Sequence, residues 1–393
     1  MAVEDGGLKQ EVVLPRDRLN ELFDELKGRG YDIIGPTVRN RAIVYDRIQS
    51  DDDLPVGKTE EQDGGHYRLR DRDDAKVFGF TVGPHSWRRF LDPPEQKVWE
   101  GSTGDDVDGF SIELTESDAP DFAFMGVRAC DLNAIKIQDR IYMGDEYEDP
   151  SYKERREGAF IIALNCSEAD DTCFCVSMDC GPEADEGYDL ALTEIYEEQR
   201  HDFLVDIGSK RGAEVMEAVR HAGASDDDRD RARKIVESTA QQMGRELNTD
   251  GIKDLLYENL EHPQWDEVAE RCLGCANCTL VCPTCFCSTV EDTSELDDDH
   301  TERWIRWDSC FNAGHSHLAG AGSVHDSIKA RYRQWLTHKL GTWIDQFGSS
   351  GCTGCGRCIT WCPVAIDLTE QVEKLRKEPS QGKEHESKTE END

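Results

Sequence analysis

The chain has 393 residues, and its 83 Asp and Glu against 45 Lys and Arg give a formal net charge of −38. A surface this acidic repels phosphate backbones and anionic lipid, which excludes a nucleic-acid partner and a membrane-surface role. Concentrated salt would screen the self-repulsion, because the Debye length falls to roughly 3 Å at 1 M. We therefore interpret the charge as the solubility chemistry of a halophilic protein, with an ordinary acidic protein as the alternative.

The sequence contains no signal for export or for a bilayer. The first ten residues, MAVEDGGLKQ, lack the basic region and apolar run of a secretory signal. No stretch reaches 18 apolar residues, so we expect no membrane insertion and a cytoplasmic location. Sixteen cysteines, many at CxxC spacing, then favour metal ligation in a reducing compartment over disulfides.

Helical and strand patterns alternate along the first half of the chain. Residues 15–28 place apolar side chains on one face of a helix. The expected strands are 31–38, 41–48, 122–127, 160–164 and 203–207. Because strands alternate with helical segments, we expect an α/β unit with a partly parallel sheet.

The second half has mainly helical patterns, interrupted by the acidic loop 291–300 and resumed over 329–347. The end of the chain has almost no apolar residues, so it is predicted to be disordered. The expected domains are an α/β domain at 1–222, which holds any third cluster, a mainly helical ferredoxin-type domain at 223–375, and a disordered acidic tail at 376–393.

Two cysteine groups share the pattern C-x2-C-x2-C-x3-C-P. Three thiolates at every third position can surround one side of a cubane, and Gly274 and Gly354 let backbone amides approach its sulfides. In two-cluster ferredoxins the fourth cysteine of each run ligates the other cluster. We expect one [4Fe–4S] cluster on Cys272, Cys275, Cys278 and Cys362, and a second on Cys352, Cys355, Cys358 and Cys282. Structural zinc is the alternative, and two complete copies ending in proline favour iron–sulfur.

The other cysteines fall into two sets. Cys285, Cys287 and Cys310 are expected to pack beside the second cluster rather than to ligate it. Upstream, two cysteines follow expected strand ends, where sites collect in α/β sheets, and three share one loop. These positions leave two hypotheses open: a third cubane on Cys130, Cys166, Cys173 and Cys175, with Cys180 as a spare, or buried cysteines without a metal.

Nothing in the sequence indicates a substrate site. There is no GxGxxG, Walker loop or GxSxG motif, so we assign no catalytic residue and no nicotinamide, flavin or ATP site. The isolated histidines are expected to be packing or hydrogen-bonding groups: His85, His315, His317 and His338. A chain with several clusters and no substrate site is interpreted as a non-catalytic electron-transfer protein.

The chain resembles the beta subunits of cytosolic NAD(P)-linked nickel–iron hydrogenases (sulfhydrogenases) and the similar iron–sulfur subunits of anaerobic sulfite reductases, over roughly residues 10–375. The resemblance rests on GVRACDLNAIKIQDRIYMG, CFCVSM, RCLGCANCTLVCPTCFCSTVED, RWDSCFNAGHSHLAG and GCTGCGRCITWCPVAIDLTE. It implies electron transfer between a catalytic subunit and a flavin-bearing, NAD(P)-linked one, and it favours the third cluster. The sequence departs from the family at Cys180, in a loop that usually carries glycine.

Two other functions stay open. One is a free-standing iron–sulfur enzyme with its own substrate pocket in the α/β domain. The other is the iron–sulfur subunit of a heterodisulfide-reductase-like or glycolate-oxidase-like complex. Such subunits usually carry CCG repeats, and this sequence has none.

Overall fold

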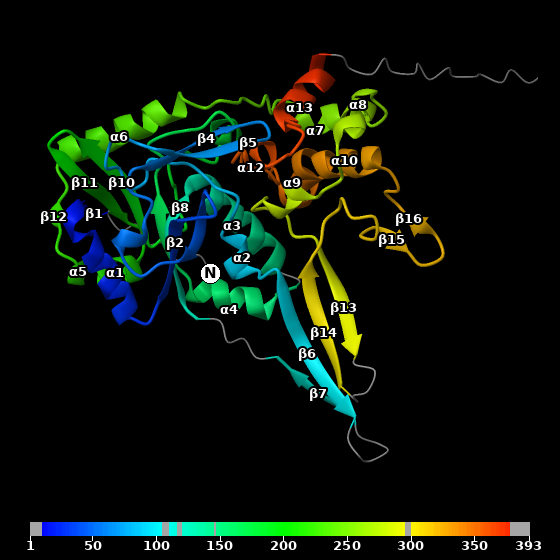
Figure 1. Cartoon of the computed structure of the whole chain (residues 1–393), viewed down its shortest axis with the longest axis horizontal. Helices are drawn as coiled ribbons and strands as arrows, with labels where there is room; N and C mark the ends of the chain where they lie inside the picture. The colour runs from blue at the N-terminus through cyan, green and yellow to red at the C-terminus, as the bar shows by residue number, and fades with distance from the viewer. Residues whose placement is uncertain (1–9, 104–109, 116–119, 145–146, 295–299, 378–393) are drawn as a thin grey trace, which may run out of the picture.

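The computed structural model describes residues 10–103, 110–115, 120–144, 147–294 and 300–377. An eight-stranded mixed sheet with the order β12-β1-β11-β10-β9-β8-β2-β3 forms the centre of the first half of the chain (Figure 1). Its inner strands β10, β9, β8 and β2 are parallel to one another. The outer strands pair antiparallel. The mixed α/β class expected from the sequence is confirmed.

All five expected strands are present, together with three that the sequence patterns did not predict. The sheet consists of β1 (Gln10–Pro15), β2 (Asp32–Arg39), β3 (Ala42–Arg47), β8 (Phe122–Arg128), β9 (Phe160–Leu164), β10 (Leu190–Glu197), β11 (Arg200–Ile207) and β12 (Ala222–Gly223). The helix expected from residue 15 begins later, as α1 (Leu19–Gly28), because β1 continues to Pro15 and a 3₁₀ turn, Arg16–Arg18, separates the two.

Helices cover both faces of this sheet, so a central strand such as β9 is apolar at every position. Along β9, Phe160 and Ile162 belong to the core under α1 and α5 (Lys210–Ala218). Ile161 and Ala163 belong to the opposite core, under α3 (Ala129–Tyr142) and α4 (Pro150–Gly158). This period of two is the reason that FIIAL is a continuous apolar run. The cysteines that follow β8 and β9 therefore lie at the carboxyl edge of the parallel strands.

A second group of helices packs around the ferredoxin motifs, at the upper right of Figure 1. Its members are α7 (Ile252–Glu258), α8 (Gln264–Arg271), α9 (Asn277–Leu280), α10 (Ile328–Thr337), α11 (Trp343–Phe347), α12 (Arg357–Thr360) and α13 (Leu368–Lys377). Their shared core contains Trp265, Tyr332, Trp335 and Leu336. A π-helical turn, His338–Thr342, joins α10 to α11.

The expectation of a mainly helical second domain is incomplete. Residues expected as an acidic loop form part of a hairpin, β13 (Ser288–Ser294) and β14 (His300–Trp307), with residues 295–299 outside the described part. This hairpin pairs with β6 (Glu95–Thr103), which in turn pairs with β7 (Phe110–Leu114). The four strands extend away from the body of the protein (Figure 1). The strands were not predicted because their sequences are acidic and lack an apolar pattern. In addition, β6, the strand that pairs with the hairpin, lies far upstream in the sequence.

Segments on the far side of both expected domain limits contact the preceding domain. Just beyond residue 222, α6 (Asp226–Ala240) packs Ala232 against Leu204 of β11, so it lies on the sheet of the first half. The division at 222 stays a prediction. Helix α13 continues through Lys377, two residues into the expected tail, and Arg376 donates to the carbonyl oxygen of Asn248 at 2.9 Å. The rest of the tail lies outside the described residues.

In the part of the chain that the structure describes, no helix is long and apolar enough to cross a membrane.

Candidate metal centre

The two ferredoxin motifs follow the same backbone path. Gly274 and Gly354 have φ values of 62° and 69°, and two residues later Ala276 and Gly356 have φ values of 64° and 76°. Each pair leads into a single helical turn, α9 in the first motif and α12 in the second. These left-handed positions suit glycine, while Ala276 adopts one at some cost in strain. The small residues therefore serve backbone conformation as well as the close approach of amides.

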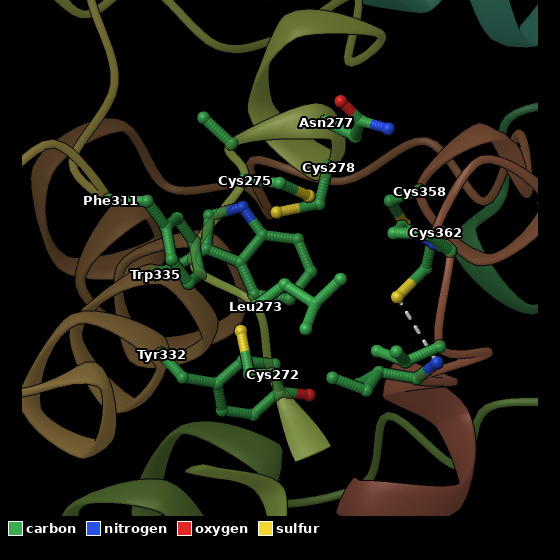
Figure 2. Close-up of a pocket in the computed structure, with 14 residues that line it drawn as sticks. Cys272, Leu273, Cys275, Asn277, Cys278, Phe311, Tyr332, Trp335, Cys358 and Cys362 are labelled. Carbon is green, nitrogen blue, oxygen red and sulfur yellow. Dashed lines mark hydrogen bonds between the residues drawn. The ribbon is translucent and has the colours of Figure 1, made fainter. Parts of the chain in front are cut away.

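Cysteines from both motifs surround one pocket. Its thiols come from Cys272, Cys275, Cys278, Cys358 and Cys362. Figure 2 shows Cys275 and Cys278 in the upper part of the pocket and Cys272 in the lower part, with Cys358 and Cys362 to their right. The fourth cysteine of the downstream motif therefore faces the first three cysteines of the upstream motif. This is the arrangement that the crossed ligand assignment requires.

Aromatic rings and backbone amides complete this pocket. Phe311, Tyr332 and Trp335 line it, and all three are buried. The amide of Gly274 donates to the sulfur of Cys272 at 3.4 Å, and the amide of Ile366 donates to the sulfur of Cys362 at 3.3 Å. Such N–H···S hydrogen bonds stabilise negative charge on sulfur and tune cluster potentials.

A second thiol group brings Cys282 to the downstream motif. Burial raises the pKa of Cys358, and the neighbouring thiols of Cys352, Cys355 and Cys282 raise it further. Burial likewise raises the pKa of Cys352 to about 12. Without a cation, the thiols of Cys352 and Cys358 are neutral at ordinary pH. A metal would have to displace their protons in order to bind.

A buried lysine contacts this second group. The ammonium of Lys339 lies 3.1 Å from the sulfur of Cys282 and 3.0 Å from the hydroxyl of Thr284, and the residue is only 5% exposed. Burial disfavours its charge, but the thiols of Cys282, Cys285 and Cys352 together raise the pKa of Lys339 well above its usual value. The hydrogen bond from Cys285, together with Lys339, lowers the pKa of Cys282. Sequence analysis missed Lys339, because it lies in a pattern typical of a surface helix.

The upstream cysteines gather at the carboxyl edge of the sheet. Cys130 lies in the first turn of α3 and packs with Cys175, Cys180 and Cys355 in one small cluster. Burial raises the pKa of Cys175, and the thiols of Cys166, Cys173, Cys180 and Cys355 raise it further. The structure thus brings together all five upstream cysteines beside a cysteine of the second motif.

The loop that carries Cys173 and Cys175 docks directly on the second motif. The amide of Phe174 donates to the carbonyl oxygen of Gly354 at 2.9 Å. The hydroxyls of Thr172 and Thr360 are 2.8 Å apart. A Cβ at position 354 would lie 2.6 Å from the carbonyl oxygen of Phe174. Glycine at this position therefore permits close contact between the two segments.

An arginine faces the upstream thiols. Arg128 ends β8, is 1% exposed, and donates through Nη2 to the carbonyl oxygens of Phe78 and Phe80. Its Nη1 has no hydrogen-bond partner among the described residues. Burial is the largest single effect and lowers the pKa of Arg128, but Cys166, Tyr45 and Glu60 together raise it above its usual value. The buried charge of Arg128 would stabilise a negatively charged group bound by these thiols, such as a cluster with thiolate ligands.

The spacing of the sulfurs tests the zinc alternative. A tetrahedral zinc with Zn–S bonds near 2.3 Å places its sulfurs about 3.8 Å apart. Within the described chain, which includes every cysteine, no three thiol sulfurs lie within 4.8 Å of one another. The one such group of possible ligands is Glu100, His300 and Glu302, where Lys97 already contacts both carboxylates. Among the described residues, the thiols are therefore not arranged as a compact three-cysteine zinc site.

The remaining candidates have other contacts. The sulfur of Cys287 accepts a hydrogen bond from Cys310, and Cys285 contacts Cys282. His315 pairs with Asp308 at 2.7 Å. The other expected packing histidines are His85 against Arg89, His338 edge-on to Phe286, and His317 on an exposed strand.

Comparison with known proteins agrees with this geometry. Residues 271–366, which contain both motifs, match the family model described as a 4Fe-4S dicluster domain. The chain is also 33% identical to sulfhydrogenase 2 subunit beta of Pyrococcus furiosus over 368 residues, or 93% of this chain and 98% of that protein. The chain belongs to the sulfhydrogenase beta subunit family. No solved structure gives a significant match.

Membership of the sulfhydrogenase beta subunit family confirms the resemblance inferred from the sequence. The match to a 4Fe-4S dicluster domain indicates that the cysteines of residues 271–366 bind iron–sulfur clusters. The chain is accordingly an iron–sulfur electron-transfer subunit of an oxidoreductase complex, as the sequence predicted.

Proposed function

We propose that the chain relays single electrons through two [4Fe–4S] clusters in the cytoplasm, between a catalytic subunit and a partner that binds flavin and NAD(P). The ligands would be Cys272, Cys275, Cys278 and Cys362 for one cluster, and Cys352, Cys355, Cys358 and Cys282 for the other. The observation that carries this proposal is the shared pocket in which Cys362 faces the upstream motif. When bound, the clusters supply reversible one-electron chemistry.

The protein's own residues would set the conditions for that chemistry. Buried aromatic side chains around the first pocket exclude water and keep the local dielectric low. Amides of Gly274 and Ile366 donate to thiol sulfurs, and Lys339 holds a positive charge beside Cys282. Each of these contacts favours added negative charge, so each would raise a reduction potential.

We also propose a third cluster on Cys130, Cys166, Cys173 and Cys175. The convergence of these thiols and the unpaired Nη1 of buried Arg128 support it. Cys355 packs against the upstream group, so the three thiol groups would form a series with the downstream motif in the middle. Cys180 lies in the same group and is the alternative ligand.

The series would reach the surface at the first cluster. Cys275 is exposed, and the neighbouring Leu273 is 63% exposed. Exposed ion pairs contribute little to binding, so a partner protein needs apolar contacts on a surface this acidic. An exposed leucine beside a cluster ligand provides such a contact. We place one of the two partners at this edge.

Iron and sulfide quantitation on anaerobically purified chain tests the proposal. Eight irons per chain support two clusters, twelve support three, and zinc or no metal contradicts the relay. The variants Cys362→Ser and Cys282→Ser are reciprocal controls, because each should perturb the electron paramagnetic resonance spectrum of a different cluster. C362S should alter the cluster held mainly by the upstream motif. NAD(P)H should reduce the clusters only when the flavin subunit is present; turnover by the isolated chain would indicate a free-standing enzyme instead.

A further inference from the structure

Two cysteines that the relay does not use lie together at the base of the β13–β14 hairpin. Cys287 immediately precedes β13, and its carbonyl oxygen accepts a hydrogen bond from the amide of Asp308 at 2.8 Å. The register pairs Ser288 with Trp307, which holds the segment around Cys310 opposite Cys287. Ser309, next to Cys310, is buried and lies 2.7 Å from the hydroxyl of Thr279 in α9. The two cysteine backbones are therefore fixed from both sides.

Their thiols are in hydrogen-bond contact. Cys310 donates to the sulfur of Cys287, and this hydrogen bond is the main reason that the pKa of Cys287 is lowered. The same hydrogen bond stabilises the protonated form of its donor, so the pKa of Cys310 is raised, with burial adding to the effect. Of the two thiols, Cys287 therefore loses its proton more readily and Cys310 keeps its proton. A thiolate paired with a protonated thiol is the arrangement used in thiol–disulfide exchange.

The pair opens to solvent on one side and faces the relay on the other. Both cysteines line a cavity of about 770 Å³, together with Arg140, Phe286, His315 and His338. On the inner side, the thiol of Cys278 is among the groups that raise the pKa of Cys310. Cys310 in turn is one of the neighbours of Cys285, which contacts Cys282. The pair therefore lies between a solvent-filled cavity and ligands of both proposed clusters.

We propose that Cys287 and Cys310 form a redox-active dithiol that reduces small organic disulfides with electrons from the iron–sulfur relay. The sulfur of Cys287 attacks the substrate R–S–S–R, forms a mixed disulfide and releases R–S⁻. The thiol of Cys310 then attacks the mixed disulfide, closes the Cys287–Cys310 disulfide and gives its proton to the second R–S⁻. Two electrons, delivered one at a time by the relay, and one proton from water restore the thiolate and the thiol. The electron supply rests on the proposed function, whereas the exchange steps do not.

The exchange is tested without any reductant, with glutathione disulfide as the probe. In the Cys310→Ser protein the mixed disulfide cannot be resolved, so mass spectrometry of digested protein should find glutathione on Cys287. In the unmodified protein and in the matched control Ser288→Ala, the product should be the internal disulfide. A C310S protein without a glutathione adduct on Cys287 overturns the proposal. So does a loss of iron in C310S or Cys287→Ser relative to the unmodified protein, because the cysteines would then be ligands.

The electron supply is tested on protein whose clusters have been reduced and freed of excess reductant. Glutathione disulfide should restore the visible absorbance of oxidised clusters in the unmodified protein and in S288A, and at least tenfold more slowly in C287S. Equal rates in C287S overturn the proposal. Absence of reoxidation in unmodified protein with full iron content also overturns it, and leaves the relay itself to be judged by its iron and sulfide content.

Discussion

Asp131 and Arg357 form a buried, two-point salt bridge between α3 and the second ferredoxin motif. Nη1 and Nη2 of the arginine lie 2.7 and 2.8 Å from the two carboxylate oxygens. The remaining donor of the arginine, Nε, bonds to the carbonyl oxygen of Gly83 at 3.0 Å, and the hydroxyl of Tyr45 donates to the aspartate. Asp131 follows Cys130, and Arg357 lies between Cys355 and Cys358. The bridge therefore fixes the upstream thiols relative to the downstream motif.

The first prediction concerns this bridge. Asp131→Ala leaves Arg357 charged and buried without its partner, so the free energy of unfolding should fall by about 3–5 kcal/mol. Replacing both residues, as in D131L/R357M, should recover much of that loss. The control is Glu61→Ala, which removes an exposed partner of Arg70 and should cost less than about 1 kcal/mol. Chemical denaturation of the three proteins measures these differences, and equal effects of D131A and E61A would contradict the prediction.

The second prediction compares two glycines with similar backbone angles. Gly354→Ala and Gly274→Ala both place a Cβ at a left-handed position, at a cost of about 1 kcal/mol. At position 354 the Cβ would also meet the Phe174 carbonyl, whereas at position 274 the nearest atom is 3.9 Å away. G354A should therefore have a thermal midpoint several degrees below that of G274A and should lose iron faster on exposure to a chelator. Similar behaviour of the two variants would show that the close contact is unimportant.

The third prediction concerns the charge of Lys339. Lys339→Met keeps the length of the side chain but removes a buried positive charge next to Cys282. The cluster that Cys282 ligates would then gain an electron less readily, so its midpoint potential should fall. A unit charge about 6 Å away at an effective dielectric constant near 20 contributes roughly 3 kcal/mol, which corresponds to about 130 mV for one electron. Spectroscopic redox titration measures this value. An unchanged potential with full iron content would place Cys282 outside the cluster.

The fourth prediction concerns pH. Glu60 is buried, and burial raises its pKa from 4.5 to about 7. A carboxyl group with a raised pKa in the folded protein contributes stability below pH 4.5 and loses that contribution as the pH rises through 7. Its Oε2 has no hydrogen-bond partner in the described residues. When Glu60 loses its proton, no donor therefore stabilises the negative charge on this oxygen.

The Glu60→Gln protein lacks this titration. Between pH 4.5 and 7, the unmodified protein should lose about 2–3 kcal/mol of unfolding free energy relative to E60Q. Denaturation curves of both proteins at several pH values give the difference in unfolding free energy directly. The pH dependence caused by all other titratable groups cancels, because both proteins contain them. A difference that does not change with pH, or that changes in the opposite direction, would show that Glu60 is ionised throughout.

The fifth prediction follows from the net charge of −38. Screening by salt reduces repulsion among exposed carboxylates, so the thermal midpoint should rise between about 0.1 and 2 M NaCl. For a chain of 393 residues, a gain of a few kcal/mol corresponds to a rise of roughly 3–6 °C. Scanning calorimetry under anaerobic conditions checks this expectation. A constant or falling midpoint would favour an ordinary acidic protein over a halophilic one.

Local patterns in the sequence were sufficient for several elements of the fold. The apolar run at 160–164 predicted β9 residue for residue, because a strand buried on both faces needs apolar side chains at every position. The hairpin of β13 and β14 was missed for the opposite reason. Its residues are polar and partly exposed, and the strand that stabilises it, β6, is about 200 residues upstream.

The candidate metal ligands were determined by the sequence itself, because three thiolates around one side of a cubane must come from one short loop with fixed spacing. Only the tertiary structure decided what surrounds them. Arg357 meets Asp131 across 226 residues, Lys339 turns inward from a helix of surface-like composition, and five scattered upstream cysteines meet at one sheet edge. Contacts of this kind depend on how distant segments pack, and packing leaves no periodic signal in either segment alone.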